Sequence, residues 1–248
     1  TFPSWSEADA STEATLTDRL IIALDVKSRA AAARLVDQLG DAVSFYKIGS
    51  PLFTRCGPDI VKELKGQGKR VFLDLKFHDI PNTVAHAVSA AVELEVDLLT
   101  VHASGGSAMI EAARKSVADT ATRILAVTLL TSFSVDDVEQ VWGKQLSSLR
   151  EEVARLGQLA ADSGAHGVIA SPLEAEALKR RHGADFLVVT PGIRPAGSER
   201  GDQMRTATPG DAIRAGADFL VVGRPVIEAD DPPAVVAQMH EEMTQVLE

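Results

Sequence analysis

The chain has 248 residues, 45% of them hydrophobic and 24% charged, a globular composition that excludes disordered, collagen-like and coiled-coil proteins. Its net charge of −10 disfavours broad contact with nucleic-acid phosphates, so we expect no nucleic-acid partner, although a local anion site remains compatible with it. Without a bilayer-length apolar stretch or a secretory signal in residues 1–18, we expect no membrane segment and a cytoplasmic location.

Short apolar runs alternate along the chain with segments in which Ala, Leu and Val repeat at helical spacing. The runs predict eight strands, at residues 19–26, 43–49, 70–77, 98–102, 123–131, 167–170, 186–190 and 219–222. The intervening segments predict helices at residues 28–39, 58–67, 83–93, 106–117, 146–163, 172–181, 208–215 and 232–247.

Apolar strands joined by helices indicate a parallel sheet with a covered outer face, and about 250 residues is the usual size of a (β/α)8 barrel. We therefore predict an α/β fold, a single-domain (β/α)8 TIM barrel over residues 19–248, preceded by a flexible N-terminal extension, residues 1–18. The alternative is an open doubly wound sheet. It is disfavoured because no Gly-x-Gly-x-x-Gly turn follows the first strand.

Charged residues end several of the predicted strands. Asp25 ends LIIALD, Lys47 lies in FYKIG, and Asp74 and Lys76 lie in RVFLDLKF, with Asp79 just beyond. Strand carboxyl ends meet at one mouth of a barrel, and Asp74 and Lys76, two residues apart, should both face inward there. Burying charges is costly even when they are paired, so we favour a functional role over a self-satisfied ion network, an alternative that is strongest for Asp25.

The loops after the last two predicted strands, TPGIRP and VVGRP, have the composition of an anion site. Gly192 and Gly223 would let backbone amides approach a phosphate, and Arg194 and Arg224 could bind it through paired donors. These loops often hold phosphate in a (β/α)8 barrel, so we expect a phosphorylated small molecule as ligand. The alternative is two ordinary turns with surface arginines.

Two further polar segments are candidates for ligand contact. Residues 196–206 form a glycine-containing stretch typical of a lid, in which Gln203 is the candidate contact, although an idle loop has the same composition. Thr131 and Ser132 follow the fifth predicted strand, where a hydroxyl could bond a polar ring or equally cap a helix.

The sequence gives little support for a metal or redox centre. Cys56 is the only cysteine, so it can form neither an intramolecular disulfide nor a cysteine cluster. His78 and His102 lack ligand spacing and an accompanying acidic cluster. We therefore expect no bound metal.

The motifs together resemble one family, the bacterial orotidine 5′-monophosphate decarboxylases, from about residue 20 to the end of the chain. The element Asp-x-Lys-x-x-Asp by itself is shared with metal-dependent sugar-phosphate decarboxylases and synthases, in which an acidic metal ligand is expected at the position of Lys47. The matching segments are ALD at 23–25, YKIG at 46–49, LDLKFHDIPNT at 73–83, LTS at 130–132, PGIRP at 191–195 and VGRP at 222–225.

The resemblance implies a decarboxylase that converts orotidine 5′-monophosphate to uridine 5′-monophosphate and CO2 in pyrimidine synthesis, without a cofactor. It implies an alternating charged array of Lys47, Asp74, Lys76 and Asp79, in which Lys76 protonates carbon 6 and Asp74 lies against the departing carboxylate. Asp79 and Thr83 would enter the partner's site, which makes a homodimer obligatory for activity.

The same resemblance implies the substrate contacts. Asp25 and Lys47 would contact the ribose, and either Thr131 or Ser132 the pyrimidine. The phosphate and the closed lid would be held by Arg194, Gln203, Gly223 and Arg224. Two alternatives remain: a metal-dependent sugar-phosphate decarboxylase or synthase on the same scaffold, and a non-catalytic nucleotide-binding protein.

Overall fold

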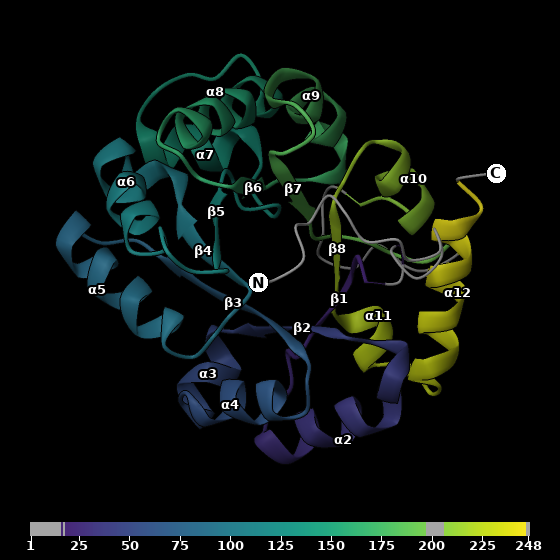
Figure 1. Cartoon of the computed structure of the whole chain (residues 1–248). Helices are drawn as coiled ribbons and strands as arrows, with labels where there is room; N and C mark the ends of the chain where they lie inside the picture. The colour runs from purple at the N-terminus through teal and green to yellow at the C-terminus, as the bar shows by residue number, and fades with distance from the viewer. Residues whose placement is uncertain (1–15, 17, 197–205, 247–248) are drawn as a thin grey trace.

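The computed structural model describes Leu16 and residues 18–196 and 206–246 (Figure 1). Eight parallel strands form a closed barrel in chain order, and β8 pairs with β1 to complete it. The closed barrel confirms the (β/α)8 prediction and excludes the open sheet. The strands are β1 (Leu20–Ala23), β2 (Phe45–Gly49), β3 (Arg70–Phe77), β4 (Leu98–His102), β5 (Arg123–Val127), β6 (Gly167–Ile169), β7 (Leu187–Thr190) and β8 (Phe219–Val222).

The helices surround the barrel and cover its outer face (Figure 1). Two short 3₁₀ helices, η1 (Gly40–Ala42) and η2 (Ala103–Gly105), accompany them. The α-helices are α2 (Arg29–Leu39), α3 (Ser50–Cys56), α4 (Asp59–Gly66), α5 (Pro81–Val92), α6 (Ser107–Lys115), α7 (Val135–Trp142), α8 (Leu149–Asp162), α9 (Pro172–His182), α10 (Pro209–Arg214), α11 (Arg224–Ile227) and α12 (Pro232–Thr244).

Two strand predictions extended three or more residues past the observed carboxyl end of the strand. The strand predicted over 123–131 ends at Val127, and the one predicted over 19–26 ends at Ala23. Beyond Val127, Leu129 and Leu130 are apolar because they pack against the two cores at the barrel mouth, outside the strand ladder. Burial therefore extends an apolar pattern further than the strand itself.

Several helix boundaries also differ from the sequence prediction. The helix predicted over 146–163 begins at Leu149, because the Ser148 side chain accepts a hydrogen bond from Glu151 N and caps it. The last helix ends at Thr244 instead of residue 247. Helices α3, α7 and α11 were not predicted, although Ser134 and Asp137 form a capping box at the start of α7.

The barrel interior holds its row of charged side chains toward the carboxyl end, above a layer of apolar side chains. At the amino end, the Arg70 guanidinium lies 4.1 Å from the Phe45 ring centroid and 5.5 Å from that of Phe219. Along β2 and β3, Lys47 and Asp74 follow Phe45 and Phe72 by two residues, so all four share the inward face. Because side chains alternate along a strand, the charged groups lie at the mouth of the barrel, next to the apolar side chains of its inner core.

The described residues before β1 pack on the barrel. Leu16 is buried in the outer core, and Asp18 Oδ1 accepts a 2.7 Å hydrogen bond from Ser44 Oγ. The rest of the predicted N-terminal extension, residues 1–15 and 17, lies outside the described residues. In the described part of the chain, no helix is both long enough and apolar enough to cross a membrane.

His166, just before β6, should make folding stability sensitive to acid. Its Nδ1 accepts a 2.9 Å hydrogen bond from Ile124 N, and burial, assisted by Arg114 and Arg123, lowers the pKa of His166 to about 4. In the unfolded chain, His166 binds a proton with a pKa of about 6.5. The stability gained from the neutral, hydrogen-bonded imidazole is therefore complete above that pH and is lost as the pH falls toward 4.

We expect His166→Asn, which keeps an acceptor but cannot gain the proton, to lose less stability on acidification. Between about pH 7 and about pH 4.5, the free energy of unfolding of the wild-type chain should fall by roughly 2 kcal/mol more than that of the variant. Denaturant unfolding at both pH values measures the difference, with His86→Asn on an exposed face of α5 as control. Equal losses in the wild type and His166→Asn would contradict the assignment.

Candidate active site

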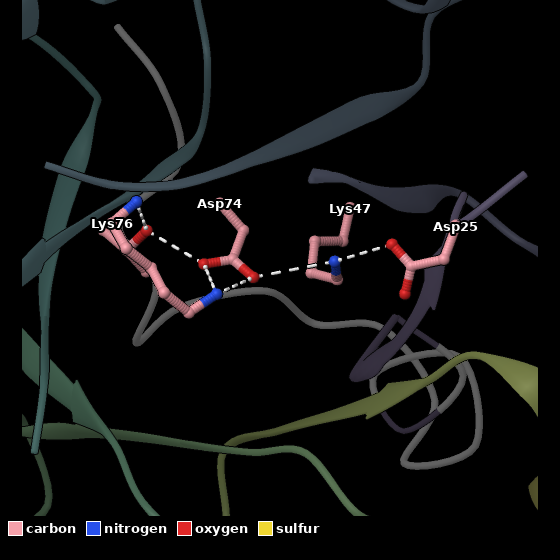
Figure 2. A network of polar contacts seen from close by, with 5 residues as sticks. Asp25, Lys47, Asp74 and Lys76 are labelled. Atoms are coloured by element: carbon pink, nitrogen blue, oxygen red, sulfur yellow. Dashed lines mark hydrogen bonds and ion pairs between the residues drawn. The ribbon is translucent and has the colours of Figure 1, made fainter. Parts of the chain in front are cut away.

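Four charged side chains form a row of alternating sign across the first three strands (Figure 2). Lys47 Nζ lies 3.2 Å from Asp25 Oδ1 and 3.6 Å from Asp74 Oδ2. Lys76 Nζ donates to both carboxylate oxygens of Asp74 at 2.8 Å. The structure thus brings Asp25, Lys47, Asp74 and Lys76 together at one mouth of the barrel, with each charge next to an opposite one.

Asp74 is the most enclosed carboxylate of this row, with 11% of its side chain exposed. Burial alone would raise the pKa of Asp74, but the Lys47 and Lys76 ammonium groups and the hydrogen bonds from Lys76 and Thr100 outweigh it. The pKa of Asp74 therefore lies below its usual value, so the group is a carboxylate at neutral pH. A fixed negative charge is thus held between two ammonium groups.

Gly49 provides the space that lets Lys47 reach Asp25. A Cβ atom at this position would lie 3.1 Å from Lys47 Nζ and 3.2 Å from Asp25 Oδ1. Both distances are tighter than a side-chain carbon normally allows, so a larger residue would push the ion pair apart. The glycine at the carboxyl end of β2 therefore belongs to the construction of the site.

The charged row lines a cavity of about 330 Å³ at the carboxyl end of the barrel. This volume lies in the range of small-molecule sites, and such sites occur at this end of the barrel. Charged groups line one part of the wall and apolar groups another, a combination that suits a ligand with both polar and planar parts. The apolar part consists of Ala23, Phe72, Val127, Leu129, Leu130, Ile169 and Val221.

Two arginines lie at the rim of the cavity, as the loop sequences predicted. Arg194 and Arg224 both line it, together with Gly192 and Gly223. Burial, and then the nearby charge of Arg224, lowers the pKa of Arg194, whereas Glu228 opposes the shift. Two guanidinium groups held close enough to repel each other form a favourable place for an anion.

The base of the predicted lid is closed by a short bridge. Ile193 pairs with Ala207, and Arg194 N donates a 3.0 Å hydrogen bond to Ala207 O. The described residues on the two sides of 197–205 therefore meet beside Arg194. Gln203, the predicted contact in this stretch, lies outside the described residues.

The remaining predicted residues divide into those inside and outside the cavity. Thr131 lines it, whereas Ser132 is exposed and does not. Asp79 and Thr83, at the start of α5, are exposed on the surface of the single chain and do not line its cavity either. Asp79 Oδ1 accepts a 2.7 Å hydrogen bond from Ile80 N, and Ile80 is 67% exposed.

Sequence reasoning missed Thr100, a residue in contact with the charged row. Its hydroxyl is fully buried and donates a 2.9 Å hydrogen bond to Asp74 Oδ1. Side chains alternate along β4, so Thr100 lies on the same inward face as Leu98. This spacing can be read from the sequence. One hydroxyl in an apolar strand is a weak sign without knowledge of its partner.

The two histidines considered in the sequence stack against each other beside the row. The His78 and His102 ring centroids are 5.3 Å apart, and burial is the main cause that lowers the pKa of His102. Within residues 16, 18–196 and 206–246, no group of three or more His, Cys, Asp or Glu side chains is arranged to hold a metal ion. In the row itself, the Lys47 ammonium occupies the position between Asp25 and Asp74.

Comparisons with known proteins point to one family. The sequence model of the orotidine 5′-phosphate decarboxylase / HUMPS family matches residues 18–239. The orotidine 5′-phosphate decarboxylase of Moorella thermoacetica is 46% identical over 236 residues, covering 92% of this chain and 93% of the relative. That of Halorhodospira halophila is 49% identical over 227 residues, covering 91% and 95%.

A solved structure shows the same likeness. The crystal structure of orotidine 5′-phosphate decarboxylase from Lactobacillus acidophilus superposes with a TM-score of 0.81 at 41% identity, covering 91% of this chain and 99% of that one. The family model covers most of the chain, and the curated relatives match along nearly their whole length. The chain therefore belongs to the orotidine 5′-phosphate decarboxylase / HUMPS family.

Proposed function

We propose that this protein converts orotidine 5′-monophosphate to uridine 5′-monophosphate and CO2, as a cytoplasmic enzyme of pyrimidine synthesis that uses no cofactor. The observation that carries the proposal is the alternating row from Asp25 to Lys76 in a cavity whose rim holds two arginines. An ammonium group at one end and an anion site at the other match the reacting ring and the phosphate of one nucleotide. The names of the relatives support the same substrate.

Lys76 supplies the chemistry in this proposal. When the bond between carbon 6 and the carboxyl carbon breaks, CO2 departs and its electron pair stays on carbon 6, where the ring delocalises it poorly. A fixed ammonium next to that atom stabilises the developing negative charge and then donates its proton to form the new C–H bond. Asp74 accepts two hydrogen bonds from Lys76 Nζ, which fixes the position of the ammonium group that donates the proton.

The other charges orient the nucleotide. The Asp74 carboxylate lies against the departing carboxylate, and Asp25 and Lys47 contact the ribose hydroxyls. Half of the Asp25 side chain is exposed, so its second oxygen is open to a ligand. Lys47, which is 10% exposed, keeps Asp25 in place through the 3.2 Å ion pair.

The phosphate and the base complete the binding mode. Arg194 and Arg224 bind the phosphate together with the backbone of Gly223, and Gln203 joins them from the lid. Because Thr131 lines the cavity and Ser132 is exposed, the geometry favours Thr131 for the pyrimidine. Phosphate contacts far from carbon 6 supply binding energy that orders the site around the reacting atom.

We also propose that the active form is a homodimer built on residues 19–248. Asp79 and Thr83 lie outside the cavity of their own chain, beside the exposed Ile80, where a second copy could cover them. In the dimer they enter the partner's site, so that Asp79 extends the alternating row beyond Lys76. Residues 1–18 precede this catalytic unit in the chain, and of them Leu16 and Asp18 pack on the barrel.

The main alternative is a metal-dependent sugar-phosphate decarboxylase or synthase, since such enzymes share the Asp-x-Lys-x-x-Asp element of residues 74–79. The position of Lys47 argues against it. The two carboxylates on either side of Lys47 already neutralise its ammonium, which fills the place where a divalent cation would need oxygen ligands. A chelator should therefore leave activity unchanged, whereas loss that added magnesium restores would favour the alternative.

Replacing Lys76 with Ala should abolish turnover. Loss of both charge stabilisation and proton donation should lower kcat by roughly 10⁴-fold or more. The assay follows the fall in ultraviolet absorbance as orotidylate becomes uridylate, with a chelator present. Lys62→Ala, on the exposed side of α4, is the matched control and should keep wild-type kcat. Substantial turnover by folded Lys76→Ala would refute the mechanism.

The shared active site predicts complementation between two inactive variants. Lys76→Ala and Asp79→Ala should each have low activity alone. After unfolding and refolding as an equal mixture, half of the dimers contain one site with both native groups, which restores about a quarter of wild-type activity per chain. Mixing without subunit exchange is the control. No recovery, with exchange shown by mass spectrometry, would place Asp79 outside the partner's site.

Arg224→Ala should act mainly on phosphate binding. Loss of a charge-assisted contact should raise KM for orotidylate roughly 10- to 100-fold. The same substitution should barely change the much slower turnover of orotidine, which lacks the phosphate. Steady-state kinetics on both substrates measures the contrast, and an equal loss on both would contradict the phosphate role.

A further inference from the structure

Thr100 connects the two groups at the reactive end of the charged row. Thr100 Oγ1 donates a 2.9 Å hydrogen bond to Asp74 Oδ1 and accepts a 2.9 Å hydrogen bond from Lys76 N. A carboxylate oxygen can only accept and an amide N–H can only donate, so both directions are fixed by chemistry. The hydroxyl of this fully buried side chain therefore bridges the Asp74 carboxylate and the Lys76 backbone.

The bridge lies where β3 departs from regular pairing with β4. Leu73 pairs with Leu99 and Phe77 with Val101, so β3 advances further than β4 between these two pairs. Thr100 faces the extra residues, and Lys76 has a φ of 52°, in the left-handed region that non-glycine residues rarely adopt. A strained backbone persists only when its surroundings hold it.

The Thr100 hydroxyl is a contact that holds this irregular backbone. Between Leu73 and Phe77 the pairing of β3 with β4 shifts register, and Lys76 lies within this irregular stretch. There the side-chain oxygen of Thr100 accepts the hydrogen bond from Lys76 N. The same oxygen fixes one side of Asp74, whose two oxygens hold Lys76 Nζ. Both ends of Lys76 are thereby tied to a single buried atom.

We propose that Thr100 is a positioning residue for the proton transfer, setting where the Lys76 ammonium lies relative to carbon 6 of the substrate. This inference rests on the proposed function, because it assigns a further residue to that reaction. Thr100 is absent from the cavity lining, so it acts only through Asp74 and Lys76. Its loss should therefore affect the chemical step and leave substrate binding nearly unchanged.

The test compares Thr100→Val, which keeps the shape and removes the hydroxyl, with Thr100→Ser, which retains it. We expect Thr100→Val to lower kcat for orotidylate roughly 100-fold, because a misplaced reacting group costs about that much, while KM changes less than about twofold. Thr100→Ser should recover kcat to within about threefold of wild type. Thr100→Ala supplies the same comparison if Thr100→Val does not fold.

Thr122→Val is the matched control. Thr122, just before β5, is also buried, and its Oγ1 donates a 2.7 Å hydrogen bond to Val96 O just before β4, at the amino end of the barrel and away from the charged row. Removing its hydroxyl should lower thermal stability but leave kcat at the wild-type value. A fall in kcat for Thr122→Val equal to that for Thr100→Val would show a general stability effect and overturn the proposal.

A second measurement needs no substrate. Hydrogen exchange of the Lys76 amide should accelerate in Thr100→Val and stay slow in Thr100→Ser and Thr122→Val. Unchanged exchange in Thr100→Val, or wild-type kcat in that variant, would overturn the positioning role, as would a loss that Thr100→Ser does not recover. If the wild-type protein does not turn over orotidylate, the proposed function fails while the exchange experiment still tests the bridge.

Discussion

The buried carboxylate of Asp74 is the charge on which the arrangement of the site depends. A lone carboxylate at this depth would be strongly disfavoured, and removing one partner of such a group costs far more than the pair gains. Its partners come from three consecutive strands: Lys47 from β2, Lys76 from β3 itself and Thr100 from β4. The register of these neighbouring strands brings them together, so the charged row depends on how β2, β3 and β4 pair.

This dependence explains why the two ends of the barrel differ. At the amino end, the Arg70 guanidinium lies over the Phe45 ring, and its Nε is 3.8 Å from Asp97 Oδ1. Its charge is therefore balanced by groups within the fold. At the carboxyl end, half of the Asp25 side chain and about a third of the Lys76 side chain (34%) stay exposed to the cavity. Charged groups that stay exposed to the cavity remain available to a bound substrate. The amino end of the barrel therefore contributes to stability, whereas the carboxyl end presents groups to a ligand.

Local periodicity in the sequence was enough to predict most of the charged row. Spacing by two places Asp74 beside Lys76, and consecutive strands of a parallel barrel make Lys47 their neighbour. The sequence was insufficient where pairing over long range decides the geometry. The shift of β3 against β4, which brings Thr100 to Asp74, depends on the register of two strands and leaves no local pattern. Leu129 and Leu130 misled the prediction of β5 because residues at the barrel mouth are as apolar as those in a strand.

Family membership alone does not decide the reaction, because the Asp-x-Lys-x-x-Asp element serves more than one chemistry. The physical difference lies in what occupies the space between Asp25 and Asp74. With an ammonium there, both carboxylates are engaged by a group that belongs to the protein. With a shorter acidic residue there, the same two carboxylates would gain a third oxygen ligand, the kind of set that hard divalent cations prefer. We therefore expect the residue at position 47 of β2 to distinguish a barrel mouth that stabilises negative charge with lysines from one that uses a metal ion.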